Sequence, residues 1–568
     1  MARLGLGIDF PLIPASPNGE ASRPIKHNEI PAHRGTNEVN MEKVKVLIAD
    51  KMDPRAAAIF QERGVEVDVK PGLTPEELRA IIGDYDGVAV RSSTRINGPA
   101  MDEALPRLKV IGRAGIGVDT IDVPAASARG IVVMNTPFGN SITTAEHAIA
   151  MIFALAREIP QADQSTQAGK WEKNRFMGVE LAGKTLGLIG CGNIGSIVAD
   201  RAHGLKMKVV AYDPFLSPER AVELGVEKVE LDELLPRADF ITLHTPLTDQ
   251  TRGILSREAL AKTKKGVRIV NCARGGLIDE AALKEGLESG HIAGAALDVF
   301  AQEPAKENPL FGTPGLICTP HLGASTTEAQ VNVAIQVAEQ MSDYLLLGGI
   351  TNAVNVPSLS AEEAPRLKPY MALAEKLGRL VGQIAGTEIR SIDIEVEGAA
   401  AELNIKPITG AVLAGVMRTW SDTVNMVNAP YLAKERGIAV REIRNEGESD
   451  YHTLVAVTVG TEEGPKRVEG TLFGNRAPRL VKIFGIPVEA ELTGQMIYIV
   501  NTDTPGFIGA LGTKLGKHKI NIATFNLGRR AEKGEAVALV AVDDPITGEV
   551  AGELRELPGV REAVPLSF

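Results

Sequence analysis

Hydrophobic and polar positions alternate with two different periods along most of the chain, which predicts strands and helices in turn. The short apolar run VKVLIAD at residues 44–50 is typical of a buried parallel strand, and the stretch from Pro54 to Arg63 that follows has helical spacing. The same order continues through VEVDVK, DGVAVRSS, KVIGRAG and IVVMNT. This regular alternation predicts a parallel sheet with helices on both faces, the doubly wound α/β fold.

A second set of strands begins with LAGKTLGLIG at residues 181–190. It continues through KVVAYD, DFITLHTP, VRIVNCAR, AGAALDV and LICTP, which makes the six strands of a full dinucleotide-binding fold. A long helix is expected over 325–347. After about residue 358 the pattern changes to α+β with antiparallel strands. From Thr493 the order is strand, helix, strand, strand, helix, strand, which predicts a ferredoxin-like unit.

These changes of pattern predict the domain boundaries. Residues 1–40 carry five prolines and no periodicity, so we expect a disordered extension there. The remaining predicted domains are an α/β substrate-binding domain over 41–138 and 326–358, a nucleotide-binding domain over 139–325, an intervening α+β domain over 359–489 and a ferredoxin-like domain over 490–568.

Composition narrows the classes of function. The formal net charge of −11 argues against nucleic-acid binding, which needs a basic surface. Cys191, Cys272 and Cys318 are too far apart in sequence for a disulfide framework or a metal cluster, which indicates a reducing cytoplasm and no metal. No apolar run reaches the ~18 residues of a membrane span. We therefore expect a cytoplasmic protein that acts on a small molecule, without membrane or nucleic-acid partners.

The segment GLIGCGNIG contains the spacing G-x-G-x-x-G after a predicted strand and before a predicted helix. Gly190 permits a tight turn, Gly192 lets a pyrophosphate approach the backbone, and Gly195 allows close helix packing. Asp213 ends the next strand and would accept hydrogen bonds from a ribose. No Arg or Lys follows it directly, which favours NAD over NADP.

Three titratable residues follow predicted strands, where open α/β sheets bind ligands: Arg274, Glu303 and His321. Each alone has a simpler explanation, as a surface arginine, a surface glutamate and a structural histidine. Together they suit reduction of a 2-oxo acid by NADH. The histidine would donate the proton, the glutamate would orient the histidine, and the arginine would hold the carboxylate.

Six motifs in order resemble the D-isomer-specific 2-hydroxyacid dehydrogenases over residues 41–358: GRAGIGVDTID, TPFGNSITTAEHAIA, GLIGCGNIG, NCARGGLIDE, ALDVFAQEP and TPHLGAST. The resemblance implies that Arg274, Glu303 and His321 are catalytic and that the cofactor is NAD. It implies a cofactor site made of Gly190, Gly192, Asn193, Ile194, Gly195, Asp213, Thr245, Cys272, Ala273, Arg274, Asp298, His321, Gly323 and Ala324.

The motif AVRSSTRI and the long C-terminal part resemble the branch of this family that oxidises 3-phospho-D-glycerate to 3-phosphohydroxypyruvate, the first step of phosphorylated L-serine biosynthesis. The resemblance implies substrate binding by Arg91, Ser92, Asn140 and Arg274. The alternatives are a reductase of hydroxypyruvate, glyoxylate or another 2-hydroxyacid, and a non-catalytic, NAD-sensing protein of the corepressor type.

The segments IVNTDTPGFIGALGTKL and KINIATFNLGR resemble an ACT domain. In relatives regulated by serine the matching positions bind the effector, which implies Asp503 and Asn521 here. The alternative is an ACT domain used for assembly alone. The family pairs through its nucleotide-binding domain and ACT domains pair edge to edge, which together imply a homotetramer. The basic positions of the intervening domain form either an anion site or a solvated surface: Lys466, Arg467, Arg476, Arg479 and Lys482.

Overall fold

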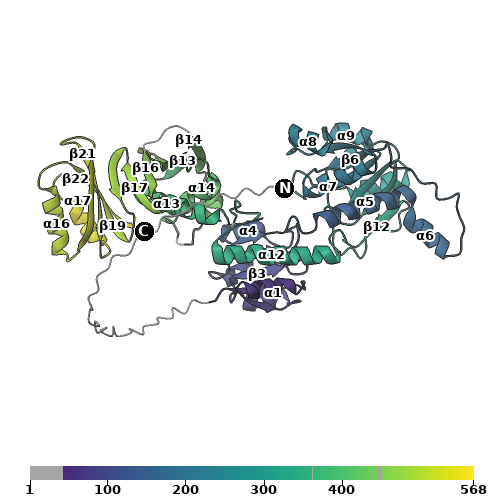
Figure 1. Cartoon of the computed structure of the whole chain (residues 1–568), viewed down its shortest axis with the longest axis horizontal. Coiled ribbons are helices and arrows are strands. Elements are labelled where there is room, and N and C mark those ends of the chain that lie inside the picture. Colours follow the sequence, from purple (N-terminus) through teal and green to yellow (C-terminus); the bar gives the residue numbers. More distant parts are fainter. Residues whose placement is uncertain (1–42, 361, 422, 446–450) are drawn as a thin grey trace, which may run out of the picture. The chain divides into compact units, whose positions relative to one another are not determined.

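The computed structural model describes residues 43–360, 362–421, 423–445 and 451–568, and its strands form four sheets (Figure 1). The predicted extension over 1–40 lies outside the described residues. Within them, no helix is both long enough and apolar enough to cross a membrane.

The first sheet has five parallel strands in the order β2-β1-β3-β4-β5. Its strands are β1 (Lys45–Ile48), β2 (Glu66–Val69), β3 (Gly87–Val90), β4 (Val110–Arg113) and β5 (Val132–Met134). The connecting helices are α1 (Arg55–Glu62), α2 (Pro75–Ile82), α3 (Gly98–Ala104) and α4 (Val123–Ala128). The long helix α12 (Thr327–Leu347) returns to this domain and packs beside α1. Its Met341 and Val337 fill the space that a side chain at Gly112 would need.

The second sheet has seven parallel strands in the order β12-β11-β10-β9-β6-β7-β8. The strands are β6 (Thr185–Ile189), β7 (Lys208–Tyr212), β8 (Glu227–Lys228), β9 (Phe240–Leu243), β10 (Val267–Asn271), β11 (Ile292–Leu297) and β12 (Leu316–Cys318). The helices are α5 (Ser141–Arg157), α6 (Ile159–Gln167), α7 (Asn193–Gly204), α8 (Pro218–Leu224), α9 (Leu231–Arg237), α10 (Arg257–Lys262) and α11 (Glu280–Glu288). The sequence predicted six of these strands. The edge strand β8 was missed because it is two exposed polar residues, which carry no hydrophobic signal.

The third sheet has the order β14-β13-β15-β16-β17-β18. Neighbouring strands in this sheet are antiparallel, as expected, except for β13 and β14. These two are parallel because two helices connect them. The elements are α13 (Ala364–Gln383), β13 (Ile389–Gly398), α14 (Ile405–Met417), α15 (Ala429–Glu435), β14 (Ala439–Asn445), β15 (Thr453–Thr461), β16 (Gly464–Phe473), β17 (Ala477–Ile483) and β18 (Ile486–Ala490). Helices α13 and α14 approach closely because a Cβ at Gly378 or Gly415 would meet a carbonyl oxygen of the other helix.

The fourth sheet confirms the predicted β-α-β-β-α-β order, with antiparallel strands arranged β20-β21-β19-β22. Both helices lie on one face of it and share its core (Figure 1). The elements are β19 (Gln495–Thr502), α16 (Phe507–Lys517), β20 (Ile522–Arg529), β21 (Glu535–Val542), α17 (Gly548–Arg555) and β22 (Val560–Ser567).

The chemistry-bearing residues of the two parallel sheets lie beyond the carboxyl ends of their strands, where such sheets bind ligands. Arg91 follows β3, Asp213 follows β7, Arg274 follows β10 and His321 follows β12. The alternation of strand and helix thus brings residues that are far apart in sequence to the same end of each sheet.

Candidate active site

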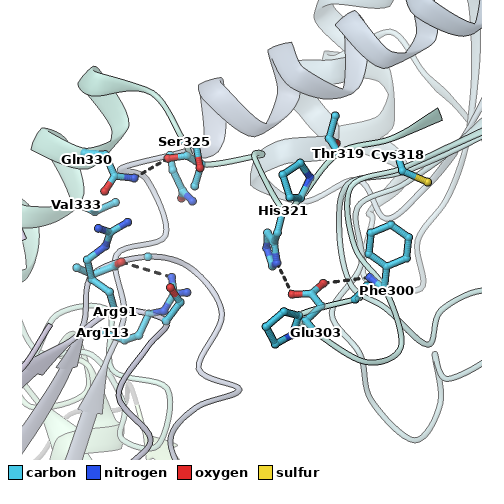
Figure 2. Close-up of a pocket in the computed structure, with 18 of the residues that line it drawn as sticks. Arg91, Arg113, Phe300, Glu303, Cys318, Thr319, His321, Ser325, Gln330 and Val333 are labelled. Carbon is cyan, nitrogen blue, oxygen red and sulfur yellow. Dashed lines mark hydrogen bonds and ion pairs between the residues drawn. The ribbon is translucent and has the colours of Figure 1, made fainter. Parts of the chain in front are cut away.

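His321 and Glu303 form a close pair. His321 Nδ1 lies 2.6 Å from Glu303 Oε2, and the other carboxylate oxygen accepts the N–H of Phe300 at 3.0 Å (Figure 2). The hydrogen bond to Glu303 raises the pKa of His321 above its ordinary value of 6.5, against the opposing effect of burial. Burial raises the pKa of Glu303, but the hydrogen bonds from His321 and Phe300 outweigh it and leave that pKa lowered. The pair therefore stabilises the protonated histidine more than water would stabilise a free imidazolium.

Asp298 holds the loop that carries the histidine. Its side chain is 0% exposed and accepts the hydroxyl of Thr319 at 2.6 Å and the N–H groups of Leu322 at 2.7 Å and Gly323 at 2.8 Å. Its backbone oxygen accepts the N–H of His321 at 2.9 Å. These bonds keep His321 at a φ of 56°, a left-handed conformation that is uncommon for a residue with a side chain.

His147 and Cys272 lie beside this carboxylate. His147 Nε2 is 3.3 Å from both Thr319 Oγ1 and Asp298 Oδ1, and with the Cys272 sulfur these ligand-type atoms lie within 4.8 Å of one another. Burial raises the pKa of the Cys272 thiol, so it stays protonated and is a poor metal ligand. The hydrogen bonds of Asp298 explain the cluster as an anchor for the histidine loop.

A cavity of about 650 Å³ lies in front of the pair. Its lining includes Arg91, Ser92 and Asn140, the residues predicted to bind substrate, together with Glu303 and His321. In Figure 2 the arginines of the first sheet stand across the cavity from the His321–Glu303 pair. The cavity therefore has a cationic side and a proton-transfer side.

Arg113 adds a second guanidinium to the cationic side. Burial lowers its pKa to about 10, which still leaves it charged at neutral pH. Its buried Nε and the buried Oδ1 of Asn140 have no hydrogen-bond partner in the described part of the chain. Buried polar atoms are normally paired, so a ligand or water in the cavity would complete both.

Arg274 does not line this cavity in the structure. Its Nε donates to Asp119 Oδ2 at 3.0 Å and its Nη1 donates to the carbonyl of Ala273 at 2.7 Å. A Cβ at Gly117 would overlap its Nη2, so the glycine is what lets the guanidinium pass. Arg274 is therefore held between the loops that follow β4 and β10, and its Nη2 has no hydrogen-bond partner among the described residues.

The glycine-rich turn has the geometry of a pyrophosphate cradle. Gly190 has a φ of 91°, and a Cβ there would meet the carbonyl oxygen of His244. A Cβ at Gly195 would overlap the oxygen of Gly190, whereas nothing lies within 4 Å of a Cβ at Gly192. Helix α7 begins without a side-chain cap, which leaves N–H groups at its start for an anion. These residues fit a dinucleotide.

Asp213 lies next to this turn. Its carboxylate accepts the N–H of Cys191 and the N–H of Phe215, both at 2.8 Å. Of the other predicted cofactor residues, Asn193 and Ile194 open α7, Thr245 follows β9, Ala273 follows β10, and Ala324 lines the cavity.

Asp503 and Asn521 do not share a cavity within one chain. Asp503 lines a pocket with Arg529, whose Nη1 donates to its carboxylate at 2.9 Å. Asn521 lies outside that pocket and donates to Asp543 Oδ2 at 2.7 Å. Asn521 is therefore not part of the pocket that Asp503 lines.

Four of the five basic positions singled out in the intervening domain are paired with carboxylates. Lys466 pairs with Glu463, Arg479 with Glu491, and both Arg467 and Lys482 with Glu469. These ion pairs use the charge that an anion site would need and favour the interpretation as a paired, solvated surface.

Sequence reasoning missed the residues that hold the candidate catalytic groups. Thr319 and Asp119 were not singled out, although both lie in or beside motifs. Asp119 is 155 residues from its partner Arg274, and Thr319 is 172 residues from His147. The one sequence signal that could have found Asp119 is an acidic residue two positions after the last glycine of GRAGIGVDTID.

Two family models match parts of the chain. A family model described as D-isomer specific 2-hydroxyacid dehydrogenase, NAD binding domain, matches residues 149–323. A second, described as D-3-phosphoglycerate dehydrogenase intervening domain, matches residues 366–484. The chain is 44% identical over 521 residues to the D-3-phosphoglycerate dehydrogenase of Synechocystis sp., covering 91% of this chain and 94% of that protein.

Two further comparisons agree. The D-3-phosphoglycerate dehydrogenase of Bacillus subtilis is 42% identical over 518 residues, covering 91% of this chain and 98% of that protein. Among solved structures, a glyoxylate reductase from Paecilomyes thermophila matches with a TM-score of 0.52 and 30% identity, over 55% of this chain and 99% of its own. That structure is therefore similar to a little over half of the chain.

The open space above Gly192 predicts a selective binding defect. Gly192→Val should weaken NADH binding at least about tenfold because its side chain would occupy the space that the cofactor needs, while the melting temperature stays close to wild type. Fluorescence titration with NADH measures this. Gly195→Val is the contrasting variant, since its side chain would overlap the Gly190 carbonyl and destabilise the domain itself. Unchanged NADH binding by Gly192→Val would place the cofactor elsewhere.

Proposed function

The chain belongs to the D-3-phosphoglycerate dehydrogenases, and we propose that it oxidises 3-phospho-D-glycerate to 3-phosphohydroxypyruvate with NAD, the entry step of phosphorylated L-serine biosynthesis. The observation that carries the proposal is the cavity itself. It sets two partly buried arginines opposite a histidine–carboxylate pair, which suits an anionic substrate that must lose a proton.

The chain's own residues account for the proton and the orientation. Because Nδ1 of His321 is bonded to Glu303, Nε2 is free to take the proton from the C2 hydroxyl. The Glu303 carboxylate then stabilises the imidazolium that forms. Bound NAD supplies the hydride acceptor. In the reverse direction the protonated His321 returns its proton to the C2 oxygen.

Different arginines would bind the two anionic groups of the substrate. Arg274 has Nη2 available and lies at the exit of β10, where it can hold the carboxylate. Arg91 and Arg113 line the cavity with Ser92 and Asn140, where they can bind the phosphate. A substrate without a phosphate would leave this side of the cavity partly unpaired, which costs affinity.

The rival functions explain less of the chain. A glyoxylate or hydroxypyruvate reductase is supported by the similarity to a solved glyoxylate reductase, which covers 55% of this chain and leaves the intervening domain without a counterpart. A non-catalytic NAD sensor would have no use for a histidine whose pKa is raised by a bonded glutamate in a cavity.

Substrate comparison tests the proposed function. The rate of NADH oxidation should give a kcat/KM at least about tenfold higher with 3-phosphohydroxypyruvate than with hydroxypyruvate or 2-oxoglutarate, because only the first carries a phosphate for the cationic side of the cavity. Equal efficiency with hydroxypyruvate would favour the rival reductase. No turnover with any of the three substrates would favour the sensor.

The His321–Glu303 pair predicts a pH dependence. Oxidation needs neutral His321, so its rate falls as the pH drops through a His321 pKa that lies above 6.5. Glu303→Gln removes the carboxylate that raises this pKa, so the fall should move to lower pH. The maximal kcat should also decrease about a hundredfold, because the histidine loses its orientation.

A nearby carboxylate is the matched control for this variant. Glu280 accepts the N–H of Ala301 at 2.9 Å and the amide of Asn308 at 3.0 Å but has no contact with His321. Glu280→Gln should keep the wild-type pH profile of kcat. A Glu303→Gln profile that coincides with wild type would rule out His321 as the proton acceptor.

Assembly, location and regulation are further parts of the proposal. A homotetramer is supported by exposed apolar residues on and after α5, among them Ile142, Phe153 and Trp171. A cytoplasmic setting is supported by three free cysteines.

We propose that L-serine binds at Asp503 and Asn521 between two ACT domains and inhibits the enzyme.

Serine inhibition is measurable directly. L-serine should lower the rate of the wild-type enzyme, and Asp503→Ala should raise the half-inhibitory concentration at least about tenfold with unchanged kcat, because it removes a carboxylate that would pair with the amino group. Asp544→Ala, an exposed acidic residue of the same domain outside the pocket, should inhibit like wild type. A wild-type enzyme insensitive to serine would leave the domain with assembly as its role.

A further inference from the structure

Asp50 is a buried carboxylate next to the candidate active site. It follows β1 and is 2% exposed. Its Oδ2 accepts the backbone N–H groups of Arg91 at 2.6 Å, Ser93 at 3.3 Å and Thr94 at 3.2 Å. Its Oδ1 accepts the hydroxyl of Thr94 at 2.6 Å. A buried charge is tolerated when it is fully hydrogen-bonded, and these four bonds meet that condition.

The four bonds determine the shape of the loop over residues 91–94. Three of its four backbone N–H groups are turned toward Asp50. The remaining one, that of Ser92, has no hydrogen-bond partner in the part of the chain that the structure describes. Ser92 and Arg91 are also the two residues of this loop that line the cavity. Two adjacent lining residues of the cavity therefore carry an unpaired backbone N–H and a guanidinium, a combination that binds anions.

Arg91 is held from both ends. Its backbone N–H is bonded to Asp50, and its Nη1 donates to the carbonyl of Lys51, the next residue along from Asp50, at 3.1 Å. Burial lowers the pKa of Arg91, and the negative charge of Asp50 opposes that change. The segment after β1 thus positions the guanidinium and balances its charge.

We propose that Asp50 is a positioning residue for the substrate, whose carboxylate shapes the 91–94 loop so that the Ser92 N–H and the Arg91 guanidinium face the substrate's anionic group. The inference rests on the proposed function, because it assigns Ser92 and Arg91 to substrate binding. Asp50 itself does not touch the substrate and acts through the loop.

Two effects of removing Asp50 oppose each other. Loss of a negative charge beside Arg91 by itself strengthens the attraction for an anionic substrate. Loss of the acceptor releases three N–H groups and the loop that they hold. The second effect is the larger, because one oxygen carries three bonds, and a binding group displaced by an ångström loses most of its hydrogen bonding.

A matched control lies in the same domain. Asp86 is 7% exposed and accepts the N–H of Lys45 at 3.0 Å and the Nζ of Lys109 at 3.1 Å. It precedes β3, whereas Asp50 follows the neighbouring parallel strand β1. The two aspartates therefore lie at opposite ends of one strand pair, with Asp50 at the end that bears the cavity.

The test compares three variants of the full chain. Asp50→Ala should raise the KM for 3-phosphohydroxypyruvate about thirtyfold or more, with the NADH dissociation constant unchanged, because NADH binds to the other domain. Asp50→Asn keeps a carbonyl oxygen in reach of the N–H groups and should restore KM to within about fivefold of wild type. Asp86→Ala should lower the melting temperature comparably and leave KM unchanged.

The pattern across the variants decides the outcome. A wild-type KM in Asp50→Ala, or an equal rise in Asp86→Ala, overturns the positioning role, since the first shows no effect on substrate and the second a general loss of stability. A KM for Asp50→Asn as high as that of Asp50→Ala also overturns it, because the charge and not the loop geometry would then be responsible.

Two situations need separate readouts. If Asp50→Ala does not fold, Thr94→Val decides, since it removes the hydroxyl bonded to Oδ1 and should raise KM about threefold; an unchanged KM overturns the proposal. If the wild-type enzyme does not turn over 3-phosphohydroxypyruvate, the proposed function fails first. If the wild type is active and Asp50→Ala has the wild-type KM, only the positioning role fails and the proposed function stands.

Discussion

Loops that leave parallel strands carry backbone N–H groups that the sheet does not pair, and in three such loops of this protein an aspartate carboxylate accepts them. Asp298 collects the N–H groups and hydroxyl of the loop before and after His321. Asp50 does the same for the loop that begins at Arg91, and Asp213 accepts an N–H from the glycine-rich turn. A carboxylate is suited to this because each oxygen accepts several bonds and stays charged when they are made. The loop that bears Arg274 uses an amide instead, because Asn271 Oδ1 accepts the N–H of Ala273 at 3.0 Å.

The two parallel sheets supply different groups of residues to the candidate active site. The five-stranded sheet supplies the arginines of the cavity, and the seven-stranded sheet supplies the histidine, its glutamate and the glycine-rich turn. In the proposed function the proton-transfer pair and the residues that would hold the cofactor therefore belong to one sheet, and the residues that would bind the substrate's phosphate belong to the other. Specificity for a phosphorylated acid can then change with one loop while the hydride and proton chemistry stays the same.

Much of the fold could be predicted, because its signals are local. The order of strand and helix, the glycine spacing at Gly190 and the ferredoxin-like order of the last domain all depend on residues within a few positions of each other. The two misses have different causes. Strand β8 is too short and polar to be seen, and the parallel pairing of β13 with β14 depends on where two intervening helices place the chain.

The sequence by itself determined the family, the cofactor class and the residue types of the site, because motif spacing and strand-end position carry that information. Tertiary structure alone decided the partners: Arg274 with Asp119, His147 with Thr319, and Asp50 with the 91–94 loop. Partners 41 to 172 residues apart are chosen by strand order and by which loops meet at one end of a sheet. A hydrogen bond requires its atoms to lie within about 3 Å, a condition that only the assembled sheet imposes.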